Sequence, residues 1–247
     1  MNNLIGISGK AGSGKDLVYT IIKDLFPEMN WGRIRFSDKL KDMVCLLLNC
    51  TREQLEDREF KEKELGKEWV KYELSYISHS RLSYGDCPEY YEKYFCSKEE
   101  AIEYIKGDLE VDQSSIEISE IGLTPRLLLQ LLGTECGRKI IHPNIWVSAT
   151  FAEYKPQHFR TVKYQGSFVD HLTTMPNWII TDVRFPNEAK AVKDRGGILI
   201  RINRPGFENT GDHLSEIALD DYKNFDTIII NDGTIEDLSK KIKEFLL

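Results

Sequence analysis

The sequence lacks the features that mark membrane, secreted and repeat proteins. It has no run of about 20 apolar residues, no basic leader before an apolar stretch, and no internal repeat. Its five cysteines form no CxxC pair and no histidine lies at zinc-finger spacing, so we interpret them as free thiols of a reducing compartment. We therefore expect a cytoplasmic protein with no membrane partner.

The chain also has fewer basic than acidic residues. The chain has 33 Lys and Arg against 40 Asp and Glu, a formal net charge of −7. Non-specific DNA binding depends on neutralising many phosphates with Lys and Arg, so we expect no direct DNA binding. A small phosphate ligand needs only a local cluster of basic groups, and it is not excluded. Four Trp, eleven Tyr and eleven Phe supply core material, which argues against a disordered chain.

Five short apolar runs have the composition of buried parallel strands. They are Leu4–Ser8, Arg33–Phe36, Trp178–Thr181, Ile198–Ile202 and Thr227–Ile230. Helical patterns separate most of them. Thr124-Pro125 combines a hydroxyl cap with a proline in the first turn, and a capping box begins at Thr234. Strands that alternate with helices predict an α/β fold in which helices cover both faces of a parallel sheet.

Residues 51–120 interrupt this rhythm. The stretch from Arg52 to Lys71 is dense in Glu and Lys, and residues 72–95 are rich in tyrosine. We expect a mainly helical insertion into a single domain of residues 1–247. Two interpretations stay open: a solvated helix beside a small satellite core, or a subdomain that covers the substrate.

A glycine-rich loop lies directly after the first predicted strand. Residues 9–16, Gly-Lys-Ala-Gly-Ser-Gly-Lys-Asp, match the motif G-x-x-x-x-G-K. In this motif the backbone N–H groups and the N-terminal end of the next helix surround phosphate, and the lysine reaches the β and γ phosphates. An ordinary glycine turn would also match, but the strand before it and the helix after it favour a phosphate loop. The expected phosphate-binding residues are Lys10, Gly12, Ser13, Gly14, Lys15 and Asp16.

Two carboxylates are candidate ligands of Mg²⁺. Asp16 replaces the usual hydroxyl of the loop, and it could hold the metal through water or pair with a nearby Lys or Arg. Asp182 ends an apolar run at the edge of the sheet where ligands bind, although an aspartate there also caps turns. Arg184 is positioned to stabilise charge on a transferring phosphoryl group, and we expect Glu188 to orient it.

The predicted helix over residues 124–141 carries polar side chains every four residues, which places them on one face. These residues are Arg126, Gln130, Thr134 and Arg138. Gly133 and Gly137 lie beside them and leave room for a ligand, although a solvated face is the alternative. Arginine can bind a phosphate through two parallel hydrogen bonds, and glutamine can read a base edge. Lys41, Trp146 and Glu188 complete the set of expected substrate contacts.

Four blocks of this sequence together resemble the bacteriophage deoxynucleoside monophosphate kinases. The blocks are Gly9–Asp16, Thr124–Arg138, Asp182–Glu188, and a tail with His213–Glu216 and Asn231–Thr234. The resemblance implies a three-layer P-loop NTPase fold with a five-stranded parallel sheet. It also implies ATP and Mg²⁺ as cofactors and a deoxynucleoside monophosphate (dNMP) as acceptor. It is compatible with a homodimer and with action in the host cytoplasm.

The same resemblance assigns roles to parts of the chain. All or part of the insertion would close over the monophosphate. Asn231 and Gly233 would lie beside the adenine of ATP, or they would simply belong to a capped turn. His213 and Glu216 have no expected role beyond membership of a flap.

The predicted reaction is in-line phosphoryl transfer without a protein nucleophile, with Lys15, Asp182 and Arg184 as the catalytic residues. Two other functions fit parts of the sequence. One is a P-loop kinase for another small acceptor, such as a dephospho-coenzyme. The other is a nucleotide-dependent switch or assembly ATPase, which would have no use for arginines on an acceptor helix.

Overall fold

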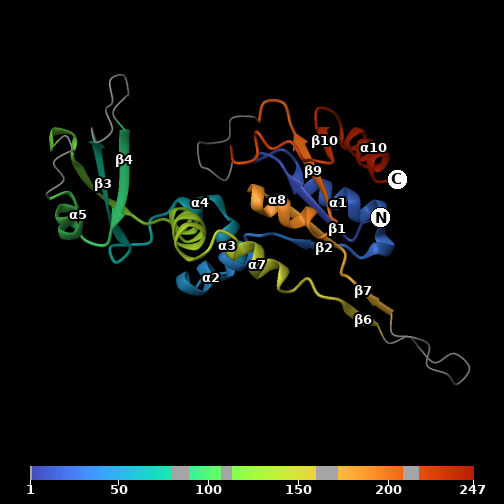
Figure 1. Ribbon diagram of the computed structural model, residues 1–247, viewed down its shortest axis with the longest axis horizontal. Coiled ribbons are helices and arrows are strands. Elements are labelled where there is room, and N and C mark those ends of the chain that lie inside the picture. Colours follow the sequence, from blue (N-terminus) through green and yellow to red (C-terminus); the bar gives the residue numbers. More distant parts are fainter. Residues whose placement is uncertain (1, 79–88, 107–112, 160–171, 208–216) are drawn as a thin grey trace, which may run out of the picture. The chain divides into compact units, whose positions relative to one another are not determined.

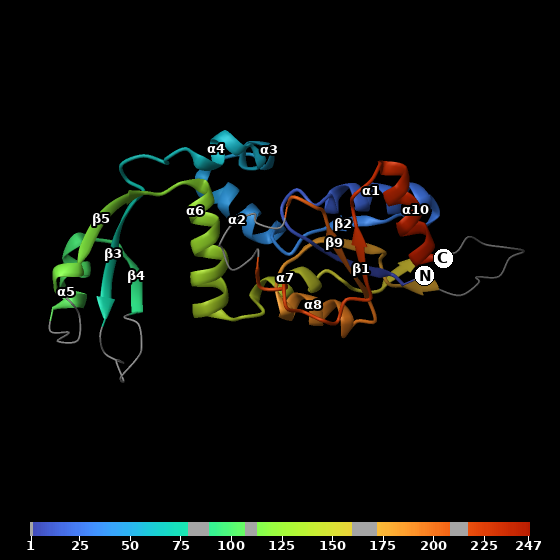
Figure 2. The same ribbon diagram turned by 90° about the horizontal axis from the view of Figure 1, so that it is seen from above.

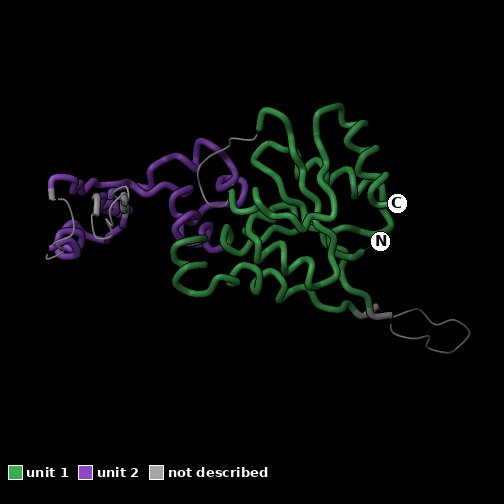
Figure 3. Tube along the Cα trace, turned by 45° about the horizontal axis from the view of Figure 1, so that its top comes forward, with its two compact units in different colours: residues 1–42, 133–247 green, residues 43–132 purple. Residues whose placement is uncertain are grey.

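The computed structural model describes residues 2–78, 89–106, 113–159, 172–207 and 217–247. The chain forms two compact units (Figure 3): residues 1–42 with 133–247, and residues 43–132. The second unit contains the predicted insertion and extends beyond it on both sides. His213 and Glu216 lie outside the described residues.

A five-stranded parallel sheet forms the centre of the first unit, in the order β10-β9-β1-β8-β2. The strands are β1 (Leu4–Ser8), β2 (Gly32–Ile34), β8 (Trp178–Val183), β9 (Ile198–Asn203) and β10 (Thr227–Ile230). The middle strand β1 is buried at all five positions and pairs Ile5 with Ile179 on one side and with Ile198 on the other. The five predicted strands and their parallel arrangement are confirmed.

Helices cover both faces of this sheet (Figures 1 and 2). Successive strand residues point to opposite faces, so Ile5 and Ile7 pack on one side and Leu4 on the other. The first face is covered by α1 (Lys15–Leu25) and α10 (Ile235–Leu246). The second is covered by α7 (Ile145–Phe151) and α8 (Pro186–Lys193). The result is the predicted three-layer α/β fold.

The smaller elements of the first unit connect these layers. They are the short helix η1 (Pro27–Met29), the helix α2 (Asp38–Leu48), which continues into the second unit, and the hairpin of β6 (Gln157–Phe159) and β7 (Leu172–Thr174). None of the helices in the described part of the chain is both long and apolar enough to cross a membrane.

The second unit holds an antiparallel sheet of order β4-β3-β5, so the prediction of a mainly helical insertion is wrong. Its elements are α3 (Arg52–Glu56), α4 (Arg58–Glu62), β3 (Val70–Ser78), β4 (Glu89–Phe95), α5 (Lys98–Ile105), η2 (Gln113–Ser115), β5 (Glu117–Gly122) and α6 (Pro125–Gln130). The physical reason is the alternation of Val70, Tyr72, Leu74 and Tyr76 along β3, because tyrosine and β-branched residues suit a half-buried strand. Leu74 and Tyr76 pack with α5 in a separate small core.

The helix predicted over residues 124–141 changes type in its second half. Thr124 caps the start of α6 through a hydrogen bond from the Leu127 N–H at 3.1 Å. From Leu131 to Ile141 the chain forms a π-helix, η3. A π-helix pairs residues five apart and is frequently found at functional sites. Glycines at 133 and 137 weaken the preference for an ordinary α-helix here.

Candidate active site

The loop between β1 and α1 can be built only with glycine at its critical positions. A Cβ at Gly9 would lie 2.5 Å from the carbonyl oxygen of Ile202, which belongs to the neighbouring strand β9. Gly14 has φ of 100° and is the N-cap of α1. A Cβ at Gly14 would lie 2.7 Å from Nδ2 of Asn231. The sheet and the residues after β10 therefore hold the loop closely, and its curvature requires positions without side chains.

The Lys15 ammonium is turned into this loop. Its Nζ donates hydrogen bonds to the carbonyl oxygens of Gly9 at 2.6 Å and of Lys10 at 2.7 Å. The N-terminal end of α1 follows directly and adds a partial positive charge. This combination of a curved backbone, an ammonium and a helix end is suited to bind a phosphate group.

The residues after β10 support the loop from the side of α10. Asn231 donates through Nδ2 to the carbonyl oxygen of Ser13 at 2.9 Å, and its N–H bonds to Asn203 at 2.7 Å. The capping box predicted at Thr234 is present, with the Asp237 N–H donating to Thr234 Oγ1 at 3.2 Å. A Cβ at Gly233 would lie 2.6 Å from the Asp237 carboxylate, so this turn is tight as well.

The other predicted loop residues have distinct surroundings. Ser13 is 1% exposed, and its Oγ has no hydrogen-bond partner among the described residues. Gly12 accepts a hydrogen bond at its carbonyl oxygen from Arg204 Nη1 at 3.2 Å. A Cβ on Gly12 would lie 2.7 Å from the Phe207 ring, so this ring packs against the loop. The segment after β9 therefore contacts the phosphate loop directly.

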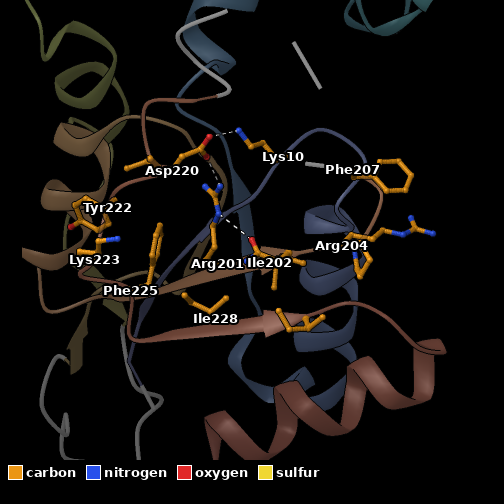
Figure 4. Close-up of a pocket in the computed structure, with 14 residues that line it drawn as sticks. Lys10, Arg201, Ile202, Arg204, Phe207, Asp220, Tyr222, Lys223, Phe225 and Ile228 are labelled. Atoms are coloured by element: carbon orange, nitrogen blue, oxygen red, sulfur yellow. Dashed lines mark hydrogen bonds and ion pairs between the residues drawn. The ribbon is translucent and has the colours of Figure 1, made fainter. Parts of the chain in front are cut away.

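Lys10 belongs to a network that the sequence did not reveal (Figure 4). Its ammonium lies 2.6 Å from Asp220, which also pairs with Arg201 at 2.9 Å. Arg201 is only 9% exposed and donates to Ser8 Oγ at 3.1 Å. Lys10, Arg201 and Asp220 line part of a cavity of about 660 Å³, beside the aromatic rings of Phe207, Tyr222 and Phe225. The contacts join β1, β9 and the segment between β9 and β10, so no local sequence motif predicts them.

Asp182 caps the turn between β2 and α2. It is 9% exposed, and its two carboxylate oxygens accept the N–H groups of Phe36 at 2.7 Å and Ser37 at 3.0 Å. Asp182 therefore caps a turn, as one interpretation of the sequence has it. It also lies at the carboxyl end of β8 with lone pairs left for a further partner, and its role in the site stays a prediction.

Asp16 pairs with arginines that were not among the predicted site residues. Its Oδ1 pairs with Arg33 Nη2, and its Oδ2 lies 3.8 Å from Arg35 Nη2. Of the two possibilities left open for this carboxylate, pairing with a basic side chain is therefore realised. The sequence pattern indicates Arg33 only as the first residue of a strand. The signal that could have identified these arginines is their spacing of two, which places one on β2 and the other directly after it.

Glu188 lies buried at the start of α8 and joins two arginine-bearing segments. It is 1% exposed and accepts from Arg138 Nη2 at 2.8 Å and from the backbone N–H groups of Arg184 at 2.8 Å and Phe185 at 3.1 Å. Burial raises the pKa of Glu188 to about 7, the nearby Asp182 carboxylate adds to the rise, and Arg138 opposes it. Glu188 thus pairs with the Arg138 guanidinium and accepts the backbone N–H of Arg184. That Glu188 orients the Arg184 side chain stays a prediction, and a side chain this buried is suited to support a site.

The π-helix η3 holds Arg138 from the other side. Its Nη1 donates to the carbonyl oxygen of Gly133 at 2.8 Å, and its guanidinium lies 4.1 Å from the centre of the Phe185 ring. The indole of Trp146 donates to the same carbonyl at 2.8 Å and is 4% exposed. The polar group of Trp146 thus supports η3, and its predicted contact with substrate stays a prediction. Thr134 is also buried, at 6% exposed.

The remaining predicted acceptor contacts are distributed over both units. Arg126 and Gln130 lie on α6 in the second unit, where Arg126 Nε donates to Glu62 Oε1, 2.5 Å away. Lys41 is half-buried on the first turns of α2, and its N–H bonds to Ser37 at 2.9 Å. The single polar stripe expected on one α-helix is thus divided between two helix types and two compact units.

Among the described residues no group of three or more His, Cys, Asp or Glu side chains forms a metal cage. In phosphate-transfer sites one or two carboxylates usually hold Mg²⁺ together with substrate phosphates. Asp16 is 64% exposed beside the loop, and Asp182 keeps acceptor capacity at the end of β8. Hard oxygen donors of this kind fit Mg²⁺.

Comparisons with known proteins show the family of this chain. A family model described as deoxynucleotide monophosphate kinase matches residues 3–242. The deoxynucleoside-5'-monophosphate kinase of Escherichia phage T5 is 29% identical over 240 residues, covering 89% of this chain and 86% of that protein. The deoxynucleotide monophosphate kinase of Escherichia phage RB69 is 30% identical over 121 residues, covering 49% of this chain and 44% of that protein.

A protein of Acanthamoeba polyphaga mimivirus, whose name assigns it provisionally to deoxynucleotide monophosphate kinases, is 35% identical over 130 residues. That match covers 49% of this chain and 60% of the mimivirus protein. The matches to the RB69 and mimivirus proteins thus span less than two thirds of their length, whereas the family model and the T5 protein match nearly the whole chain. The chain belongs to the deoxynucleotide monophosphate kinase family.

Proposed function

We propose that this protein transfers the γ-phosphoryl group of ATP to a deoxynucleoside 5'-monophosphate. The observation that carries the proposal is the Lys15 ammonium held inside a glycine loop, 2.6 Å from the Gly9 carbonyl, at the carboxyl end of the central strand. The names of the relatives support the same activity, since the T5 and RB69 proteins are named as kinases of deoxynucleoside or deoxynucleotide monophosphates.

ATP binds with its phosphates in the loop of residues 9–14. Lys15 exchanges its carbonyl partners for phosphate oxygens, and the loop N–H groups with the end of α1 add further positive potential. Lys10, Gly12 and Ser13 form the rest of this cradle. Asn231 and Gly233, beside the loop on the α10 side, border the donor nucleoside.

Asp16 and Asp182 are the residues that would hold Mg²⁺. The metal supplies neutralisation of phosphate charge when it is bound. The carboxylates of this chain act by keeping oxygen donors at the edge of β1 and β8, next to the loop. Asp182 also fixes the turn before α2 through its bonds to Phe36 and Ser37, at 2.7 and 3.0 Å.

The acceptor monophosphate lies beyond β8. Arg138 and Arg184 supply positive charge there, and Glu188 positions Arg138 and the backbone of Arg184. The acceptor phosphate oxygen is already ionised at neutral pH, so positioning and electrostatic stabilisation perform the catalysis. Lys41 and Thr134 complete the acceptor contacts of the first unit. Arg126 and Gln130 are the candidate acceptor contacts of α6.

The second unit acts as the NMP-binding or lid region of the kinase. A covering subdomain would exclude water from the transfer and limit wasteful hydrolysis of ATP. The enzyme works as a homodimer in the cytoplasm of the host cell, where its cysteines stay reduced.

A coupled assay of ADP release tests this function directly. ATP and Mg²⁺ are supplied with each dNMP and each ribonucleoside monophosphate in turn, and we expect stimulation by one or more dNMPs. Stimulation by dephospho-coenzyme A alone would favour a kinase for another small acceptor. Slow hydrolysis that no monophosphate accelerates would replace the kinase with a nucleotide-dependent switch.

Replacing Asn231 with alanine should weaken ATP binding several-fold with little loss of stability. The variant loses the 2.9 Å hydrogen bond to Ser13 that braces the loop, a bond worth about 0.5–1.5 kcal/mol. The KM for ATP should rise while the KM for dNMP stays the same. Asp232→Ala is the matched control, because Asp232 pairs with Lys241 at 2.7 Å and has no bond to the loop among its known contacts. Equal effects of the two substitutions would show that Asn231 has no special role.

A further inference from the structure

The ion pair between Asp16 and Arg33 lies beside the phosphate loop. Asp16 is the second residue of α1, directly after Lys15. Arg33 and Arg35 are two apart on and after β2, so their side chains extend to the same side of the strand, and both approach the Asp16 carboxylate. Two guanidinium groups thus share one carboxylate beside the phosphate loop.

Several contacts fix the direction of the Arg33 side chain. Its Nη2 pairs with Asp16, and its Nε lies 3.5 Å from Oγ1 of Thr181 on β8. The guanidinium also lies 5.6 Å from the centre of the Tyr19 ring. An arginine held by three neighbours from α1 and β8 loses less conformational freedom when it binds a ligand than a free surface arginine would.

Stability alone does not account for this arrangement. The Arg33 side chain is 32% exposed and that of Asp16 is 64% exposed. Ion pairs with this much exposure contribute little to folding, because water and salt screen them. An exposed but well-oriented guanidinium is instead suited to bind an anion, and arginine can engage phosphate through two parallel hydrogen bonds.

The strand order indicates which phosphate Arg33 would meet. In the order β10-β9-β1-β8-β2, Asn231 follows β10 on one side of β1, and Arg33 lies on β2, two strands away on the other side. In-line transfer requires the acceptor to approach from the side opposite the leaving group. With the donor nucleoside bordered by Asn231, β2 is on the acceptor side.

We propose that Arg33 is a further phosphate-binding residue for the acceptor monophosphate and that Asp16 is its positioning residue. This inference rests on the proposed kinase function. It also gives a reason for the carboxylate at position 16, because a serine or threonine hydroxyl in the same place carries no charge with which to hold a guanidinium.

Equilibrium binding tests this proposal independently of turnover. Binding of dAMP, dCMP, dGMP and dTMP is measured by calorimetry without ATP or metal, and ATP binding is measured separately. Arg33→Ala should weaken the binding of the accepted dNMP about tenfold or more, with ATP affinity unchanged within about twofold. Arg33→Lys should fall in between, since lysine keeps the charge but loses the two-point contact. Lys243→Ala, which removes an exposed positive charge from α10, is the control and should bind as the wild type does.

A double-mutant cycle tests the role of Asp16. Asp16→Ser should weaken dNMP binding, and Asp16→Ser combined with Arg33→Ala should be no weaker than Arg33→Ala alone. Effects that multiply would overturn the positioning role, and so would an Asp16→Ser variant that changes only the Mg²⁺ requirement. Normal dNMP binding by Arg33→Ala would overturn the phosphate contact. A wild-type protein that neither binds nor phosphorylates any dNMP would instead refute the kinase function itself.

Discussion

Replacing Lys15 with alanine is expected to lower kcat by about 10²–10³-fold while the protein stays folded. The ammonium is held in the loop by the carbonyl oxygens of Gly9 and Lys10, at 2.6 and 2.7 Å, where a transferred phosphoryl group would gain negative charge on its oxygens. Removing it takes away an interaction that strengthens in the transition state, so the loss should appear mainly in kcat. Steady-state kinetics with ATP and the preferred dNMP measure it.

The matched control is Lys23→Ala, which removes an exposed lysine from the last turn of the same helix. Both variants should keep a melting temperature within a few degrees of the wild type, because neither lysine fills the core. If Lys15→Ala turned over at near-normal rate, the loop of residues 9–16 would not be the donor site. If it unfolded, circular dichroism would reveal that before any kinetic interpretation.

Replacing Glu188 with alanine should destabilise the first unit by about 3–5 kcal/mol, the usual cost of removing one partner from a buried ion pair. The change leaves the Arg138 guanidinium without its 2.8 Å partner and leaves the N–H groups of Arg184 and Phe185 unsatisfied. Activity should fall as well, because Arg138 loses its orientation. Urea denaturation gives the free energy of unfolding. Glu135→Ala, which breaks the exposed pair with Lys139 on η3, should cost less than about 1 kcal/mol.

Glu188→Gln separates the charge of this residue from its shape. Burial raises the pKa of Glu188 from 4.5 to about 7 in the folded protein, so the folded state binds a proton more tightly than the unfolded state. Proton binding by Glu188 therefore adds to the free energy of unfolding below pH 4.5, and this contribution is lost as the pH rises through about 7. Relative to Glu188→Gln, the wild type should therefore lose stability between these two pH values.

The pH dependence of activity should run in the opposite direction. The carboxylate must be ionised to pair with Arg138, so kcat/KM of the wild type should decline as the pH falls below about 7. The glutamine variant should lack this decline. Identical pH profiles for the two proteins would show that protonation of Glu188 does not control Arg138.

The parts of this molecule that local chemistry determines could be predicted from the sequence. The strand, glycine loop and helix around Lys15 follow from apolar runs, backbone freedom and capping, and each of these is read within a few residues. The capped helix starts at Thr124 and Thr234 are also predicted from a few neighbouring residues. The three-stranded sheet of the second unit differs from the prediction. Val70, Tyr72 and Leu74 alternate as in a strand, but the charged stretch before them favours helices.

Long-range pairing could not be predicted. Arg138 meets Glu188 across 50 residues of sequence, and Arg201 meets Ser8 across 193. Nothing in the spacing of such residues indicates that they share a contact, since the register of neighbouring elements decides it. The change from α-helix to π-helix at Leu131 could not be predicted either. It alters the face on which Arg138 lies, and Arg138 pairs with Glu188 on α8.

The chain passes between its two compact units inside helices. The first crossing lies between Asp42 and Met43 in α2, and the second lies between Leu132 and Gly133 in η3. A chain divided at these points would end within helices and not in loops. Carbonyl and N–H groups at the interrupted helix ends would then lack their partners. Exchange of the second unit between relatives, in evolution or in the laboratory, would therefore have to join helix to helix in phase.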